Sequence, residues 1–248
     1  MPAAKLYAIP ASHPCAAVEA ALRLKGVDYE RVELIPVAAK LVQWRRFHAT
    51  TVPGVEFADG ERVVGSRQII RALEHRAPEP HLLPLDANER REVEEAEKWG
   101  DQVLQPLARR LAWASLKRAP GRVTAYSEGA KLPVPAPLAK LSAPLVARAA
   151  AKLNGASDGE VRADLINLEL HLDRADGWIE TGAIGGAAPS AADLQVCSGL
   201  RLMQTLEDLA PRIDARPCGR LARRVFPDYP GSVPAGTLPA AWLDARAP

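Results

Sequence analysis

The chain has 248 residues, 48% of them hydrophobic and 25% charged, and a formal net charge of +2 at pH 7. Such a composition is ordinary for a globular protein with a large core, and the small net charge gives no drive toward nucleic acid. The cysteines Cys15, Cys197 and Cys218 lack C-x-x-C spacing, which argues against a disulfide framework or a zinc site and favours a reducing compartment. We find no signal peptide and no apolar run of about 18 residues, so we expect a cytoplasmic protein without a membrane span.

The first 78 residues alternate strand and helix patterns. Apolar runs predict strands at 6–9, 28–34, 55–57 and 62–64, and the last two flank Asp59-Gly60, a typical hairpin turn. Helical spacing of apolar residues predicts helices at 14–25 and 37–47 and a third that begins at Ser66. Strands joined through a helix should pair in parallel, and hairpin strands antiparallel. This order predicts an α/β thioredoxin-like domain over residues 1–78.

A linker with several prolines follows at 77–86, and after it strand patterns largely disappear. Apolar spacing predicts one long helix at 87–118 and shorter ones at 144–153, 158–179 and 191–205. We therefore expect an all-α domain over residues 87–226, followed by a Pro-rich extended tail at 227–248.

One insert in this second part is apolar, rich in proline and longer than an ordinary connection. It spans residues 131–144, and we expect either a lid over a cleft or a surface loop packed on the long helix. Basic residues without acids in and after it give a weaker alternative, contact with a membrane surface.

Three local motifs occur in a fixed order along the chain. The first is the turn Pro10-Ala11-Ser12-His13-Pro14-Cys15, the second is Val52-Pro53, and the third is Ser190-Ala-Ala-Asp193, which has capping-box spacing. Together they resemble the glutathione transferase superfamily. The resemblance implies a thioredoxin-like half that binds a small thiol, a helical half that holds an apolar acceptor, and a homodimer.

The resemblance assigns roles to residues of the first half. Ser12 matches the catalytic serine, whose hydroxyl would donate a hydrogen bond to the sulfur and favour the thiolate, helped by the positive end of the following helix. Val52 and Pro53 match a cis-proline turn that faces the thiol ligand. Ser66 matches the residue that receives the glutamyl carboxylate of glutathione, and Arg67 could pair with a carboxylate. The alternative for Ser12 is a plain turn or helix-capping serine.

Two departures from the family pattern affect the choice of thiol. Gly65 stands where an acidic residue usually holds the amino group of glutathione, and Thr50 and Thr51 stand where a basic or amide side chain often meets its glycyl carboxylate. We therefore expect glutathione or another low-molecular-weight thiol as the co-substrate, or a pocket that has lost thiol binding.

Other residues near the first turn have two readings each. Cys15 is either a redox thiol or a small buried residue. His13 is either a partly exposed turn residue or a proton carrier or haem ligand, and His48 is either an exposed loop residue or a haem ligand.

Haem is considered because residues 26–55 also resemble the membrane-associated prostaglandin E synthase type 2 branch. The alternative function is therefore a non-catalytic protein that binds haem or an apolar ligand. For the acceptor pocket that the helical half should supply, the long helix offers Trp99, Val103 and Trp113, unless they are core.

Overall fold

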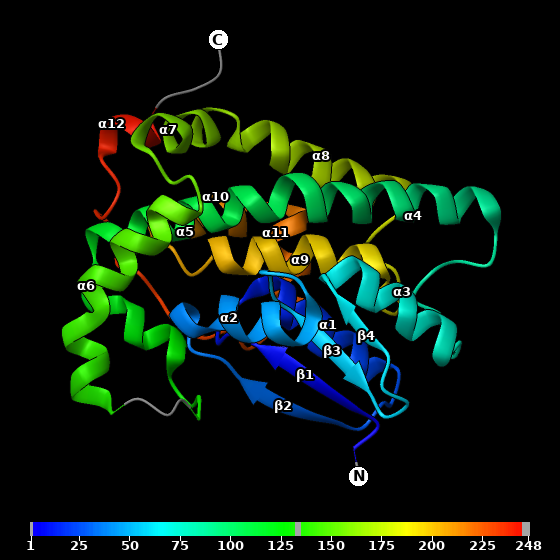
Figure 1. Cartoon of the computed structure of the whole chain (residues 1–248). Coiled ribbons are helices and arrows are strands. Elements are labelled where there is room, and N and C mark those ends of the chain that lie inside the picture. Colours follow the sequence, from blue (N-terminus) through cyan, green and yellow to red (C-terminus); the bar gives the residue numbers. More distant parts are fainter. Residues whose placement is uncertain (1, 132–134, 245–248) are drawn as a thin grey trace.

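The structure is a computed structural model that describes residues 2–131 and 135–244. A small sheet with its helices occupies one side, and the remaining helices lie against it (Figure 1). Elements of the first part are β1 (Ala4–Ala8), α1 (His13–Leu24), β2 (Tyr29–Glu33), α2 (Pro36–Phe47), β3 (Gly54–Phe57), β4 (Arg62–Val64) and α3 (Ser66–Arg76). The predicted α/β thioredoxin-like fold is confirmed.

The sheet has the strand order β2-β1-β3-β4. β1 pairs in parallel with β2, as expected for strands that α1 connects, and β3 pairs antiparallel with β4 across the Asp59-Gly60 turn. Leu6 and Val55 lie opposite each other on β1 and β3, and both are fully buried. This register brings the carboxyl end of β1 next to the start of β3, so the Ser12 turn and the Pro53 turn meet at one edge of the sheet.

The second part is entirely helical among the residues that the structure describes, apart from one isolated bridge, so the predicted all-α half is confirmed. Its elements are α4 (Ala87–Trp99), η1 (Gly100–Leu104), α5 (Gln105–Arg118), η2 (Pro120–Ser127), α6 (Ala136–Leu153), α7 (Asp158–Ile166), α8 (Leu168–Thr181), α9 (Ala191–Met203), α10 (Ala210–Asp214), α11 (Pro217–Val225) and α12 (Ala240–Leu243). α4, η1 and α5 form the predicted long helix, with a π-helical turn at η1.

α9 is the central helix of the molecule. All of its residues are buried, and it packs against α1 and α3 on one side and against α4, α5 and α11 on the others (Figure 1). At its N-terminus Ser190 and Asp193 form the predicted capping box, in which each side chain bonds the other residue's backbone N–H. Because α9 contacts both parts of the chain, its position fixes how the sheet and the long helix sit relative to each other.

Several predicted boundaries were wrong. The helix predicted at 144–153 begins at Ala136, so Pro144 lies inside α6 and the insert is half helix. The insert residues 132–134 lie outside the described residues. The helix predicted at 158–179 is two helices, α7 and α8, because the helix pauses at Asn167, whose side chain bonds the Ala163 carbonyl.

The tail at 227–248, which was predicted to be extended, is partly helical. It contains the short helix α12, and its last four residues lie outside the described part of the chain. Val233 and Leu238 are buried, and Val233 pairs with Leu206 in an isolated parallel bridge. Tyr229 reaches back to the first turn, where its hydroxyl donates a 2.9 Å hydrogen bond to the Ala11 carbonyl. The tail is therefore a packed part of the fold.

Candidate functional site

Ser12 lies between β1 and α1 as the N-cap of α1. Its backbone is extended, at φ −75° and ψ 113°, and its side chain makes no capping hydrogen bond. Ala11 before it adopts a left-handed conformation with φ 54°, and the Ser12 N–H closes the turn on the Ile9 carbonyl at 3.2 Å. A helix N-terminus has unpaired N–H groups and a partial positive charge. A partly exposed hydroxyl at this place suits an anionic sulfur.

Cys15 is packed one turn into α1 and is fully buried. Burial raises its pKa to about 11, although hydrogen bonds from Ser12 and from the Ile9 backbone act in the opposite direction. Cys197 and Cys218 are also buried free thiols, and burial raises the pKa of each. A buried, protonated thiol is a poor nucleophile. The structure therefore favours the reading of Cys15 as a packing residue.

The Val52-Pro53 peptide bond is cis, as the sequence motif indicated. Pro53 is buried, and its carbonyl accepts a 3.0 Å hydrogen bond from the N–H of Gly65. Gly65 has φ 92°, a region that favours glycine, and a Cβ on it would strike the side chain of Gln68. The backbone conformation at position 65 therefore favours glycine, and an acidic side chain there would be strained.

Ser66 begins α3, but its hydroxyl is already engaged. Its side chain donates to Gln195 Oε1 at 3.2 Å and accepts from Gln105 Nε2 at 3.2 Å, and Gln105 also donates to Gln195 at 2.5 Å. All three side chains are buried where α3, α5 and α9 meet. The Ser66 hydroxyl joins the sheet-bearing part to the helical part, so its predicted role in holding the thiol would need this network to open.

Arg67 is likewise held by a residue of the long helix. Its Nε donates to Glu97 Oε2 at 3.0 Å, and Arg71 donates to the same oxygen. Glu97 is completely buried, and the loss of hydration raises its pKa despite the two arginines. The predicted pairing of Arg67 with a ligand carboxylate would therefore compete with an internal carboxylate.

His13 is buried, with 2% of its surface exposed, so the expectation of a partly exposed turn residue was wrong. Burial and the nearby Arg109 lower its pKa to about 3, while a hydrogen bond to the Gln105 backbone acts the other way. Its Nε2 has no hydrogen-bond partner among the described residues. Arg109, at the same junction, forms no ion pair with any residue that the structure describes, and burial lowers its pKa. The sequence offered no pattern that singled out Arg109.

The pH dependence of stability should report the burial of His13. The folded state holds the imidazole neutral, whereas the unfolded chain takes up a proton below about pH 6.5. The free energy of unfolding should therefore decrease by up to about 1.4 kcal/mol per pH unit as the pH falls from about 6.5 toward 3. Urea unfolding between pH 7 and pH 4 measures this slope.

His13→Gln should have a flatter slope than the wild type, and His75→Gln, a change at an exposed position of α3, should keep the wild-type slope. If His13→Gln and wild type lose stability in parallel, His13 is not the group responsible.

His48 lies at the C-terminal end of α2. It caps the helix in a left-handed conformation with φ 54°, its N–H bonds the Trp44 carbonyl at 3.0 Å, and its side chain is exposed. Neither candidate haem ligand has surroundings that favour haem, since His13 is enclosed and His48 is exposed. Haem binding stays a prediction from the sequence. Among the described residues no group of three His, Cys, Asp or Glu side chains gathers as in a metal site.

A cavity of about 610 Å³ opens beside Ser12, and we call it the Ser12 cavity. Its floor is the outer face of α1 and its far wall is the segment after α11. The lining includes Ala11, Ser12, Ala16, Glu19, Ala20, Arg23, Leu24, Arg31, Pro189, Leu194 and residues 225–230. The candidate acceptor residues Trp99, Val103 and Trp113 are not part of it. Trp99 packs edge to face against Trp178 with ring centroids 5.1 Å apart and belongs to the core.

Three charged side chains on one side of this cavity, Glu19, Arg23 and Arg31, pair with one another. Glu19 accepts hydrogen bonds from Tyr29 at 2.7 Å and from Arg23 at 2.8 Å, and also bonds Arg31. The remaining lining is mainly alanine, leucine, proline and aromatic rings. The Ser12 cavity thus combines apolar surface with charged side chains at its edge, and the Ser12 hydroxyl lies at the helix end. The sequence did not indicate it, because the tail that forms its wall looked like an extended terminus.

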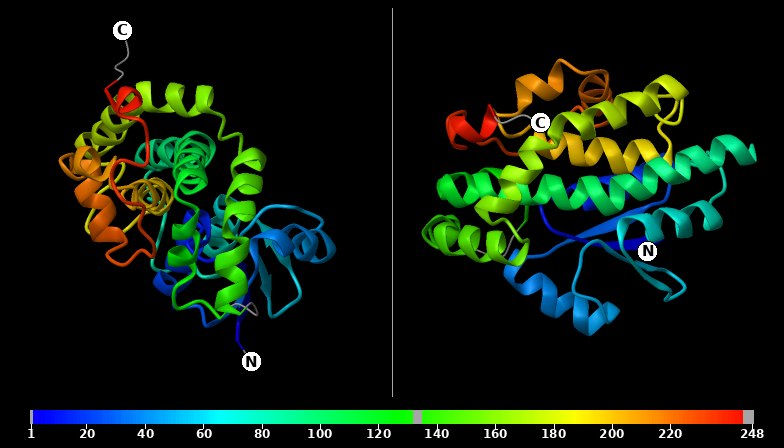
Figure 2. Two further views of the ribbon diagram at one scale, coloured as in Figure 1. Left: turned by 90° about the vertical axis from the view of Figure 1, so that its left-hand side faces the viewer. Right: turned by 90° about the horizontal axis from the view of Figure 1, so that it is seen from above.

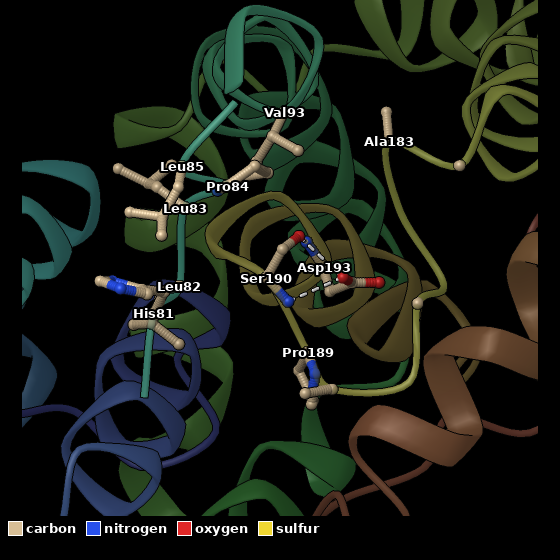
Figure 3. A pocket seen from close by; sticks show the side chains of 13 residues that line it. His81, Leu82, Leu83, Pro84, Leu85, Val93, Ala183, Pro189, Ser190 and Asp193 are labelled. Atoms are coloured by element: carbon tan, nitrogen blue, oxygen red, sulfur yellow. Dashed lines mark hydrogen bonds between the residues drawn. The ribbon is translucent and has the colours of Figure 1, made fainter. Parts of the chain in front are cut away.

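A second cavity, of about 230 Å³, lies away from Ser12 at the start of α9. Figure 3 shows the linker residues His81 to Leu85 on one side and Ser190 and Asp193 on the other. The two polar side chains that face it are bonded to each other at 2.7 Å within the capping box. Its polar groups are therefore occupied by the fold, and it carries no evident chemistry.

The family comparison covers the first part of the chain. Residues 6–81 match the model described as glutathione S-transferase, N-terminal domain. This part of the chain is therefore similar to the N-terminal domain of glutathione S-transferases. No curated protein matches the full sequence.

Solved structures extend the likeness across both parts of this glutathione S-transferase-like chain. A glutathione S-transferase from Rhodospirillum rubrum F11 is 20% identical with a TM-score of 0.56, over 98% of this chain and 99% of that one. Another, from Sinorhizobium meliloti 1021, is 17% identical with a TM-score of 0.57 and 98% coverage of both. A maleylacetoacetate isomerase from Anaeromyxobacter dehalogenans 2CP-1, with bound GSH in its active site, is 23% identical with a TM-score of 0.52, covering 90% and 89%. These likenesses show the shared fold.

Proposed function

We propose that the chain is a thiol transferase in which Ser12 stabilises the thiolate of glutathione or another low-molecular-weight thiol. The sulfur then forms a bond to an electrophilic carbon, and a leaving group departs with its electron pair while the thiol proton passes to solvent. One observation carries the proposal. The Ser12 hydroxyl caps no helix N–H and opens, at the positive end of α1, on a cavity large enough for a small acceptor.

The thiol in this proposal is either glutathione or a small thiol with different end groups, because the side chains that would hold the two ends of glutathione are altered. Gly65 has no carboxylate, the Ser66 hydroxyl is used between helices, and Arg67 pairs with Glu97. Glutathione remains a candidate, since a solved structure with the same fold has GSH bound. A thiol with different end groups is equally consistent with this pocket. A homodimer and a cytoplasmic location stay part of the proposal, on the basis of the family resemblance.

The test is the transfer of a thiol to an activated aryl chloride with each of several cellular thiols. With the preferred thiol, Ser12→Ala should reduce kcat/KM by about 10- to 100-fold, because a hydrogen bond to a charged sulfur contributes about 1.5–3 kcal/mol. The rising limb of the pH–rate profile should also move up by about one to two units, since the bound thiol loses the group that favours its thiolate.

Ser127→Ala, at a partly exposed serine in η2, is the matched control and should keep the wild-type rate and pH profile. A Ser12→Ala variant that retains the wild-type pH profile would show that the hydroxyl does not act on the sulfur. No transfer by the wild type with any thiol would rule out the proposed enzyme.

A further inference from the structure

α6 buries one face and leaves the opposite face apolar. The buried face consists of Ala143, Ala147 and Ala151, four residues apart, which pack toward α5 and η2. On the outward face stand Leu138, Leu141 and Leu145, which are 55%, 80% and 73% exposed. Their spacing of three and four residues places them on one stripe of the helix. A surface helix normally directs polar residues outward. An exposed apolar stripe of this kind indicates a binding surface.

The charge on α6 is of one sign. The helix carries Lys140, Arg148 and Lys152, all exposed, and no acidic residue. None of the three forms an ion pair with a residue in the part of the chain that the structure describes. By contrast, the exposed Leu170 of α8 has acidic neighbours, Glu169 beside it and Asp173 one turn on. α6 therefore presents an apolar and cationic face on a molecule whose net charge is only +2, and α2, with the exposed Leu41 and Trp44, presents another.

We propose that the outward face of α6 binds the surface of an anionic lipid bilayer. A helix with leucines on one stripe and lysine and arginine beside them lies in the plane of the membrane interface, with the leucines among the acyl chains and the cations at the phosphates. α6 stands at one edge of the molecule, at the left of Figure 1 and of the right-hand view of Figure 2, so a flat surface can approach it. The attachment is peripheral, because no helix in the described part of the chain is long and apolar enough to cross a membrane.

A second copy of the chain is the less suitable occupant of this face. In a twofold dimer the same patch meets itself, so Lys140, Arg148 and Lys152 of one subunit would face the same cations of the other. The desolvation and repulsion of these charges disfavour that arrangement, whereas phosphate and carboxylate headgroups neutralise them. The patch is complementary to a negative surface and not to itself.

Co-sedimentation with vesicles tests the proposal on the full chain. At low salt the wild type should bind vesicles that contain about 30% phosphatidylserine and not pure phosphatidylcholine vesicles, and salt should weaken the binding. The double variant Leu141→Glu/Leu145→Glu should bind at least about tenfold more weakly. Lys140→Gln and Lys152→Gln should each weaken binding about fivefold, since one cation near an anionic surface contributes about 1 kcal/mol.

Leu170→Glu on α8 is the matched control and should bind like the wild type. Both exposed-leucine variants should keep the wild-type circular dichroism and the rate of thiol transfer, which separates this proposal from the proposed enzyme. Failure of the wild type to bind anionic vesicles overturns the membrane proposal. So does a double variant that binds vesicles normally but changes from dimer to monomer, because a second copy would then cover the face.

Discussion

Gly219→Ala should destabilise the protein by about 3 kcal/mol or more, and urea unfolding at pH 7 should show it as a lower midpoint. Gly219 lies in α11, and a Cβ built on it would overlap the backbone carbonyl of Ile213 in α10. The obstacle is backbone and not a flexible side chain, so α10 and α11 would have to separate. Such a shift would also disturb the 2.9 Å hydrogen bond that Gln204 donates to the Gly219 carbonyl.

A second helical glycine provides the control for this change. Gly177 lies inside α8, where a Cβ would meet no atom within 4 Å. Gly177→Ala should therefore stabilise the protein by about 0.5–1 kcal/mol through helix propensity alone. Opposite signs at the two positions would confirm the close contact of α10 and α11; a small loss at both would contradict it.

Asp193→Ala should lower the free energy of unfolding by about 3–5 kcal/mol. The buried carboxylate accepts hydrogen bonds from the N–H of Gly185 at 2.8 Å, from the N–H of Ser190 at 2.8 Å and from the Ser190 hydroxyl at 2.7 Å. Alanine would leave two backbone N–H groups without their acceptor and remove a negative charge from the start of α9. Thermal and urea unfolding measure the loss.

Ser190→Ala should cost only about 1–2 kcal/mol, because it removes the capping oxygen and keeps the carboxylate. Asp193→Asn should fall between the two, since the amide retains one acceptor oxygen without the charge. If Asp193→Ala is no worse than Ser190→Ala, the carboxylate does not hold the loop before α9 as the hydrogen bonds indicate.

The sequence predicted the elements with strong local patterns. The hairpin around Asp59-Gly60, the Ser66 start of α3, the long helix at 87–118 and the capping box at Ser190 all occur where expected. These features depend on neighbours within a few residues, which the sequence displays directly. The break at Asn167 goes with a side-chain hydrogen bond to the Ala163 carbonyl, which apolar periodicity does not register. The start of α6 was placed too late because Pro144 was taken as its first residue, whereas the helix runs through it.

The candidate site was harder to predict because its residues come from distant parts of the chain. The turn with Ser12 and the cis peptide at Pro53 followed from motifs, but the partners of Ser66 are Gln105 and Gln195, and nothing local marks those glutamines. His13 illustrates the same limit. Its place in a turn indicated exposure, and the long helix that covers it comes some ninety residues later.

The hydrogen bond from Tyr229 to Ala11 has a consequence for how the protein is made. A ribosome delivers Ala11 early and Tyr229 near the end, because 218 residues separate them. During synthesis the sheet can form while one wall of the cavity beside Ser12 does not yet exist. A nascent chain that stops before residue 227 would thus hold the sheet without most of this wall, and the Ser12 turn would lack its hydrogen bond from Tyr229. One wall of the cavity and the turn beside it are therefore contributed by segments that leave the ribosome far apart in time.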